Sequence, residues 1–77
     1  MRKRQTISKE AFWLLAELAR MRANSKGCKG AMLVYCDGLT QMEAANRMDC
    51  DQSSIARPCA NIKRIRQVVD RLIRELS

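Results

Sequence analysis

Residues 39–65, LTQMEAANRMDCDQSSIARPCANIKRI, decide the fold. Two short helical patterns are separated here by MDCD, a gap of about one turn. A helix-turn-helix needs a small residue in its first helix, apolar residues at the turn and an aliphatic anchor in its second helix. Those positions hold Ala45, Met48, Cys50 and Ile55. Asp49 stands where the turn usually has glycine, and Asp tolerates the left-handed conformation better than most residues. We therefore predict a helix-turn-helix at about 39–58.

Pro58 complicates the second helix of this unit. It lacks the amide that would donate to the carbonyl of Ser54, and its ring disfavours helical geometry at Arg57. Two interpretations stay open: the helix kinks at Pro58, or a short reading helix ends there and Pro58 opens a long C-terminal helix at about 59–76. Either interpretation limits the secure reading segment to residues 51–57.

Cap and stop signals organise the rest of the chain. They are Ser8, Ser25, the glycine Gly38, and Thr40 with Glu43 in a capping-box arrangement. A helix follows Ser8 with a broad apolar stripe, which predicts burial on more than one side. A second helix is expected at about 25–36, although Gly27 and Gly30 weaken its first half.

Composition agrees with this helical pattern. The chain has 77 residues, of which 47% are hydrophobic and only 4% aromatic, with 3 glycines and 1 proline, so a sheet is not expected. We predict an all-α fold: a small helical bundle of four to five helices with a long C-terminal helix. A basic N-terminal arm at 1–7 is expected to precede a single domain at 8–77.

The charge of the chain indicates a polyanionic partner. It has 15 Lys and Arg against 8 Asp and Glu, a net charge of +7, although a merely basic soluble domain is the alternative. No apolar run is long enough to cross a bilayer, and MRKRQTISKE does not resemble a secretory signal. We expect a cytoplasmic protein with no membrane partner.

Catalysis and metal binding are not expected. The chain has no histidine, and its four cysteines, Cys28, Cys36, Cys50 and Cys59, form no C-x-x-C pair. Buried reduced thiols are favoured over a disulfide framework. No nucleophile stands beside an evident base, so we predict a non-enzyme without cofactor, metal or small-molecule ligand.

The start of the second helix presents polar side chains suited to DNA. Gln52 fits a bidentate contact with adenine, Ser53 or Ser54 a phosphate or base, and Arg57 guanine or phosphate. Asp51 is the natural helix cap, and its charge repels phosphate unless it faces away. The predicted DNA-binding set is Thr40, Gln41, Asp51, Gln52, Ser53, Ser54, Arg57, Asn61, Lys63 and Arg64, with Arg2, Lys3 and Arg4 of the arm. For the arm, a solvated tail without function is the alternative.

Apolar residues recur at coiled-coil intervals in the C-terminal helix. The predicted oligomerisation stripe is Ile62, Ile65, Val69, Leu72 and Leu76. Packing on the first helix of the same chain and packing on a second chain both stay open. Because so short a chain has a small core, a shared interface is a reasonable source of stability, and we predict a homo-oligomer.

Three segments in succession, FWLLAELARM, AMLVYCDGLTQMEAANRM and DQSSIARPCANIKRI, resemble the PapB-type regulators of adhesin (fimbrial) operons in enteric bacteria, over roughly residues 12–72. Plasmid repressors of the KorA or TrfB type are close competitors. The resemblance implies a nucleoid-associated transcription regulator, such as a repressor, that binds AT-rich operator DNA as an oligomer. It implies DNA contacts by Gln52, Ser53, Ser54 and Arg57, with Lys63 and Arg64 on the backbone. The chain departs from the family in its short length, Pro58 and its cysteine content.

Two other classes of function stay open. An RNA-binding or nucleic-acid-packaging helper would also explain the charge. It requires stacking aromatics, and only Phe12, Trp13 and Tyr35 are available. A helical protein-interaction module would use the C-terminal stripe, with the charge incidental.

Overall fold

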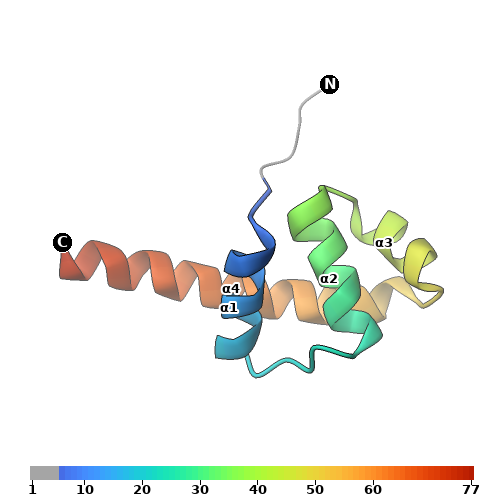
Figure 1. Cartoon of the computed structure of the whole chain (residues 1–77), viewed down its shortest axis with the longest axis horizontal. Coiled ribbons are helices and arrows are strands. Elements are labelled where there is room, and N and C mark those ends of the chain that lie inside the picture. Colours follow the sequence, from blue (N-terminus) through green and yellow to red (C-terminus); the bar gives the residue numbers. More distant parts are fainter. Residues whose placement is uncertain (1–5) are drawn as a thin grey trace.

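The computed structural model describes residues 6–77, which fold into helices without any strand. The four helices of this region are α1 (Lys9–Leu18), α2 (Lys26–Asp37), α3 (Gln41–Met48) and α4 (Gln52–Leu76). The all-α fold class and the long C-terminal helix are thereby confirmed. In Figure 1, α2 and α3 lie beside the first half of α4, α1 crosses α4 near its middle, and the rest of α4 extends past α1.

The predicted caps begin and end these helices. The side chains of Ser8 and Ser25 accept hydrogen bonds from amides in the first turns of α1 and α2. Thr40 and Glu43 form a reciprocal capping box with hydrogen bonds of 2.9 and 3.1 Å. Gly38 ends α2 in the left-handed conformation, at φ 76°. The starts of α1, α2 and α3 and the end of α2 are therefore set by residues close to them in the sequence.

The core is small and consists largely of residues with short side chains. Its buried members are Phe12, Leu15, Ala16, Cys28, Ala31, Ala44, Ala45, Ile55, Cys59 and Ile62. The prediction that α1 is buried on more than one side is wrong, because Leu14 and Leu18 are 62% and 60% exposed. Only one face of α1 packs against the other helices, and its second apolar face is left at the surface.

The two glycines of α2 permit a close approach between α2 and α4. A Cβ atom at Gly27 would lie 2.8 Å from the carbonyl oxygen of Ser54 and 2.9 Å from Cγ of Pro58. A Cβ at Gly30 would overlap Cδ1 of Ile55. These glycines lower helix propensity, as the sequence indicates, but they also provide the surface on which α4 packs.

Pro58 lies inside α4, which runs without interruption from Gln52 to Leu76. The interpretation in which a short reading helix ends at Pro58 and a new helix begins is therefore wrong, as is the boundary between 58 and 59. Proline deprives the carbonyl of Ser54 of its usual intrahelical donor. That carbonyl lies against Gly27, where α2 approaches most closely. Pro58 thus belongs to the helix–helix contact.

The domain begins one residue earlier than predicted. The amide of Ile7 donates a 2.9 Å hydrogen bond to the carbonyl of Tyr35 in α2. Its side chain is half-buried against the core. Ile7 therefore belongs to the domain, and not to the predicted arm. The arm residues Arg2, Lys3 and Arg4 lie outside the described residues.

Candidate nucleic-acid interface

The turn between α3 and α4 contains a left-handed residue at the position predicted for it. Asp49 adopts the left-handed conformation, with φ 55° and ψ 52°. Its amide donates to the carbonyl of Asn46 at 3.2 Å, and the amide of Cys50 donates to the carbonyl of Ala45 at 3.0 Å. These bonds satisfy carbonyls at the end of α3. The prediction that Asp49 serves where glycine is usual is confirmed.

The inner side of this corner is closed by the residues predicted for it. Ala45 is 3% exposed and Ile55 is fully buried. Met48 and Cys50 are half-buried at the turn. Because alanine has so small a side chain, α3 lies close to α4, and Ile55 extends from there across to Gly30 of α2. The contact fixes both helices and directs the other side of α4 outward.

The outward face of α4 carries the residues predicted to read DNA. Ser53, Arg57 and Arg64 are exposed and lie at helical spacing opposite Ile55. Ala60 is exposed on the same face and was missed by the sequence reasoning, although its position three residues after Arg57 was the available signal. An alanine methyl on such a face is suited to contact the methyl group of thymine.

The structure gathers the predicted residues into two groups. Thr40, Gln41 and Gln52 line a surface hollow of about 440 Å³ between α2, α3 and α4. Ser53, Ser54, Arg57 and Pro58 line a neighbouring hollow of about 420 Å³ at the start of α4.

The remaining predicted residues lie further along α4. Lys63 and Arg64 are exposed, whereas Asn61 is half-buried. The two cations therefore extend the polar surface of α4 beyond the two hollows. Asn61 has less surface available to a ligand.

The two predicted cap residues differ in how they are used. The hydroxyl oxygen of Thr40 accepts from the amide of Glu43, so it holds the start of α3 in place. Asp51 occupies the cap position of α4, but its side chain makes no capping hydrogen bond. Asp51 therefore stands at the predicted cap position, but the prediction that its side chain caps the helix is wrong. Its carboxylate is exposed at the start of α4.

Two of the four cysteines are buried in the core. All four are free thiols, with Cys28 and Cys59 buried. Burial raises the pKa of the Cys59 thiol to about 11, and burial also raises the pKa values of Cys28 and Cys36. The hydroxyl of Tyr35 donates to the carbonyl of Cys59 at 2.9 Å. The buried thiols are therefore neutral at physiological pH and act as small apolar side chains.

Two other features are absent from residues 6–77. This part of the chain holds no group of three or more His, Cys, Asp or Glu residues placed to bind a metal ion. Nor does any helix within it have the length and apolar character needed to span a membrane.

The predicted oligomerisation stripe divides along α4. Ile62 is fully buried in the core of its own chain, so it has no surface left for a second copy. Ile65 and Val69 are half-buried against that core. Leu72 and Leu76 are 54% and 77% exposed. The intramolecular interpretation therefore holds for the first part of the stripe, and only the last part is open to another chain.

Comparison with known proteins finds no matching family model, no similar curated protein and no similar solved structure. The resemblance to PapB-type regulators remains a prediction, and the function has to be argued from the geometry of the chain.

Proposed function

We propose that this protein is a sequence-selective DNA-binding transcription regulator that inserts the first half of α4 into the major groove. The observation that carries the proposal is the corner between α3 and α4. Ala45 and Ile55 occupy its inner side, while Ser53 and Arg57 face outward. To read a DNA groove, a helix has to pack against its own domain on one side and carry polar side chains on the other. The resemblance favours a fimbrial or plasmid operon as its target, and the bacterial nucleoid as its location.

The distribution of charge supports a nucleic-acid partner. The net charge is +7, and Arg57, Lys63 and Arg64 lie exposed on α4. In this proposal Arg57 reads a base, and the two later cations contact phosphates. The start of α3, held by its capping box, directs its free amides at the backbone of the duplex.

The aromatic residues favour duplex DNA over single-stranded RNA. Phe12 is fully buried, and the hydroxyl of Tyr35 is bonded to the backbone of α4. Trp13 is 37% exposed on α1, where it lines a hollow together with Arg47 and Met48 at the end of α3. RNA-binding modules usually stack bases on several exposed rings, and the reading face of α4 has none.

The proposal is tested by titrating the protein against a duplex selected from genomic fragments and against a scrambled duplex, each at two salt concentrations. Arg57→Ala is the test variant and Arg71→Ala its control, since both remove one positive charge from an exposed position of α4. We expect Arg57→Ala to weaken binding to the selected duplex by roughly 1–3 kcal/mol. The control should leave the ratio of specific to non-specific affinity unchanged.

Two results would contradict the proposal. Equal affinity of the unchanged protein for both duplexes would exclude sequence-selective binding. A large fall in the melting temperature of Arg57→Ala would show that Arg57 has a structural role. Because its side chain is exposed, we expect the melting temperature to stay within a few degrees.

A further inference from the structure

A hollow lies over α2, between α1 and α3. Both α1 and α3 pack against α2, but their backbones do not come into contact with each other, and Figure 1 shows them on opposite sides of α2. The hollow has a volume of about 520 Å³, within the range of about 300–1,000 Å³ that is usual for small-molecule sites. We call it the α1–α3 hollow. Its lining includes Trp13 of α1, Lys29 and Met32 of α2, and Arg47 and Met48 of α3.

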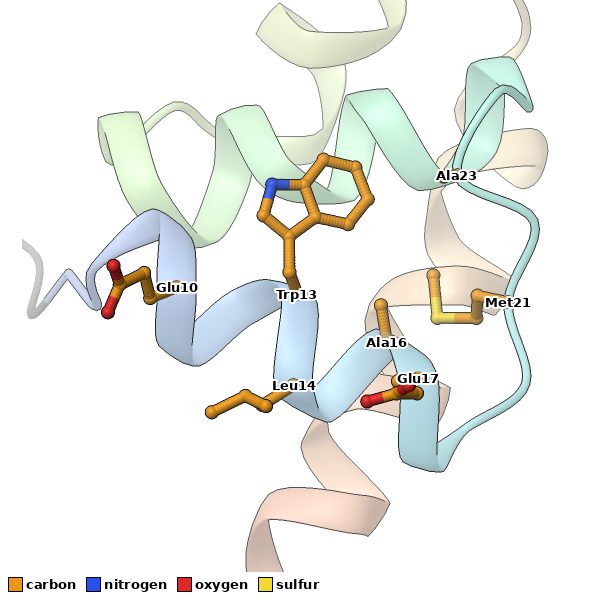
Figure 2. A pocket seen from close by; sticks show the side chains of 7 residues that line it. All are labelled: Glu10, Trp13, Leu14, Ala16, Glu17, Met21 and Ala23. Carbon is orange, nitrogen blue, oxygen red and sulfur yellow. The ribbon is translucent and has the colours of Figure 1, made fainter.

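The apolar part of the α1–α3 hollow is suited to an aromatic ring. Trp13 is partly exposed, and its ring lies edge-on to the buried ring of Phe12, with the two centroids 5.4 Å apart. Figure 2 shows the indole of Trp13 extending from α1 toward α2. Met32 and Met48 are half-buried in the same hollow. Because aromatic rings pack favourably against indole and thioether groups, these three side chains favour an aromatic ligand over an aliphatic one.

The charged side chains that line the α1–α3 hollow are both cations. Lys29 and Arg47 are exposed there, and no acidic residue of the described chain lines it. Glu10 and Glu17 line a second hollow that shares Trp13, and Figure 2 shows them nearer the two ends of α1. A guanidinium pairs bidentately with a carboxylate, and an ammonium adds a point charge. The α1–α3 hollow therefore favours an anion, and among anions a carboxylate.

The α1–α3 hollow lies apart from the surface proposed to read DNA. Arg47 and Met48 are at the end of α3, whereas Gln41 is at its start and lines a different hollow. Glu43 and Asp49 are the acidic residues nearest to Arg47 in the sequence, and neither lines the α1–α3 hollow. The carboxylate of Glu43 accepts the hydrogen bond of the capping box at the start of α3. The two cations are thus placed to meet a ligand other than DNA.

We propose that the α1–α3 hollow binds a small aromatic carboxylate. The ring lies against Trp13 and the two methionines, and the carboxylate lies between Lys29 and Arg47. The net charge of +7 also attracts an anion to the chain. Because Trp13, Lys29 and Arg47 belong to three different helices, no local motif indicates the site, and the sequence alone predicts no small-molecule ligand.

The probe for this site is 3-phenylpropanoate, and 3-phenylpropanamide, which has the same ring without the charge, is its matched control. Binding is followed by the fluorescence of Trp13, the only tryptophan of the chain. We expect a saturable change with the acid. The amide should bind about three- to tenfold more weakly, because exposed ion pairs contribute modestly to affinity. The acid should also shift the amide resonances of Lys29, Met32 and Arg47.

A pair of double variants separates the two cations of the hollow from the net charge of the chain. Lys29→Ala with Arg47→Ala removes both of them, and Lys26→Ala with Arg71→Ala removes two exposed cations that do not line the hollow. We expect the first variant to bind the acid about three- to tenfold more weakly than the unchanged protein. The second should stay within about twofold, because distant charges are screened by salt.

Absence of saturable binding of the acid would overturn the proposal, as would equal affinities for the acid and the amide. An equal loss in the two double variants would also overturn it, because net charge alone would then explain the binding. So would resonance shifts confined to residues outside the hollow. Circular dichroism reports whether each variant stays folded. If the first variant unfolds, the comparison of acid with amide on the unchanged protein decides the outcome.

Discussion

The two halves of α4 have the same helical geometry and opposite surroundings. In the first half, Ile55 and Ile62 are fully buried, whereas in the last turns Ile73 is 58% exposed and Leu76 is 77% exposed. Both halves present aliphatic residues toward the side where the other helices lie. What differs is the partner: the first half has the glycine surface of α2 and the alanines of α3, and the second half extends past α1.

This difference shows that an apolar stripe does not by itself reveal whether it is buried within its chain. The apolar residues from Ile62 to Leu76 recur at regular intervals. Their side chains nevertheless change from fully buried to mostly exposed along the helix. Burial depends on which helices lie beside each part of α4, and beyond the point where α1 crosses it no other helix of residues 6–77 does (Figure 1). The outward side of the first half and most of the second half are consequently left exposed.

The largest contrast is expected from the same substitution in each half. Ile55→Ala removes a fully buried side chain and should lower the free energy of unfolding by about 2–5 kcal/mol. Ile73→Ala removes a mostly exposed one. At concentrations where the protein is monomeric, it should change stability by less than about 0.5 kcal/mol. Urea unfolding followed by circular dichroism measures both. Equal losses would show that the two halves are packed alike.

The next largest effect is expected from a substitution at Gly30, where α2 packs against α4. Gly30→Ala should raise the helix propensity of α2 by about 1 kcal/mol, but the added methyl overlaps Ile55. We expect a net loss of about 1–3 kcal/mol in the free energy of unfolding. Lys29→Ala, at an exposed position next to it, is the matched control and should be nearly neutral. A stabilised Gly30→Ala variant would refute the close approach of α2 and α4.

The buried thiol in the first half of α4 predicts a pH dependence. The pKa of Cys59 is raised from 9.0 to about 11 by burial, so the unfolded chain loses this proton at lower pH than the folded one. Stability is therefore unchanged below about pH 9 and falls as the pH approaches 11. We expect a loss of about 1–2 kcal/mol over this interval.

Cys59→Ala is the control for this pH dependence. Its unfolding free energy should fall less between pH 9 and 11 than that of the unchanged protein. Part of the fall remains, because burial also raises the pKa values of Cys28 and Tyr35. Identical slopes for the two proteins would mean that Cys59 ionises as freely in the folded chain as in the unfolded one.

The smallest effect is expected at Asp51, on the reading end of α4. Asp51→Asn removes a negative charge that makes no capping hydrogen bond, and Asn is an equally good cap residue. Binding to scrambled DNA at low salt should tighten by a few-fold, because one repulsion with phosphate is lost. Glu75→Gln makes the same change of charge in the last turn and should have no such effect. If both variants tighten binding equally, net charge alone sets the affinity.

Much of the fold follows from local chemistry that is visible in the sequence. Ser8, Ser25 and the Thr40–Glu43 box begin helices, and Asp49 turns the chain, because caps and turns depend on residues a few positions apart. The packing role of Pro58 and of the two glycines was not predictable, for the opposite reason. Each weakens its own helix by local rules, and only the contact between Gly27 and Ser54, which are distant in the chain, explains why they are compatible with the fold.

The candidate site was predicted in part. The outward positions of Ser53 and Arg57 follow from the inward position of Ile55, since helical spacing relates them directly. Ala60 was missed because alanine has no polar group to suggest a contact, and only its position three residues after Arg57 places it on the same face. The division of the stripe between core and surface was not predictable, because it depends on the position of α1 relative to α4 and no local interval encodes that position.

The division of α4 is tested most directly by following the amide resonances of the isotope-labelled protein in two series. In one series a selected DNA duplex is added, and in the other the DNA-free protein is diluted. We expect DNA to shift resonances at Thr40, Gln41 and residues 52–64, and dilution to shift those at 68–76, where the predicted oligomerisation stripe is exposed. Shifts induced by DNA that fall mainly on residues 68–76, with residues 52–57 unchanged, would contradict the assignment of the first half of α4 to DNA.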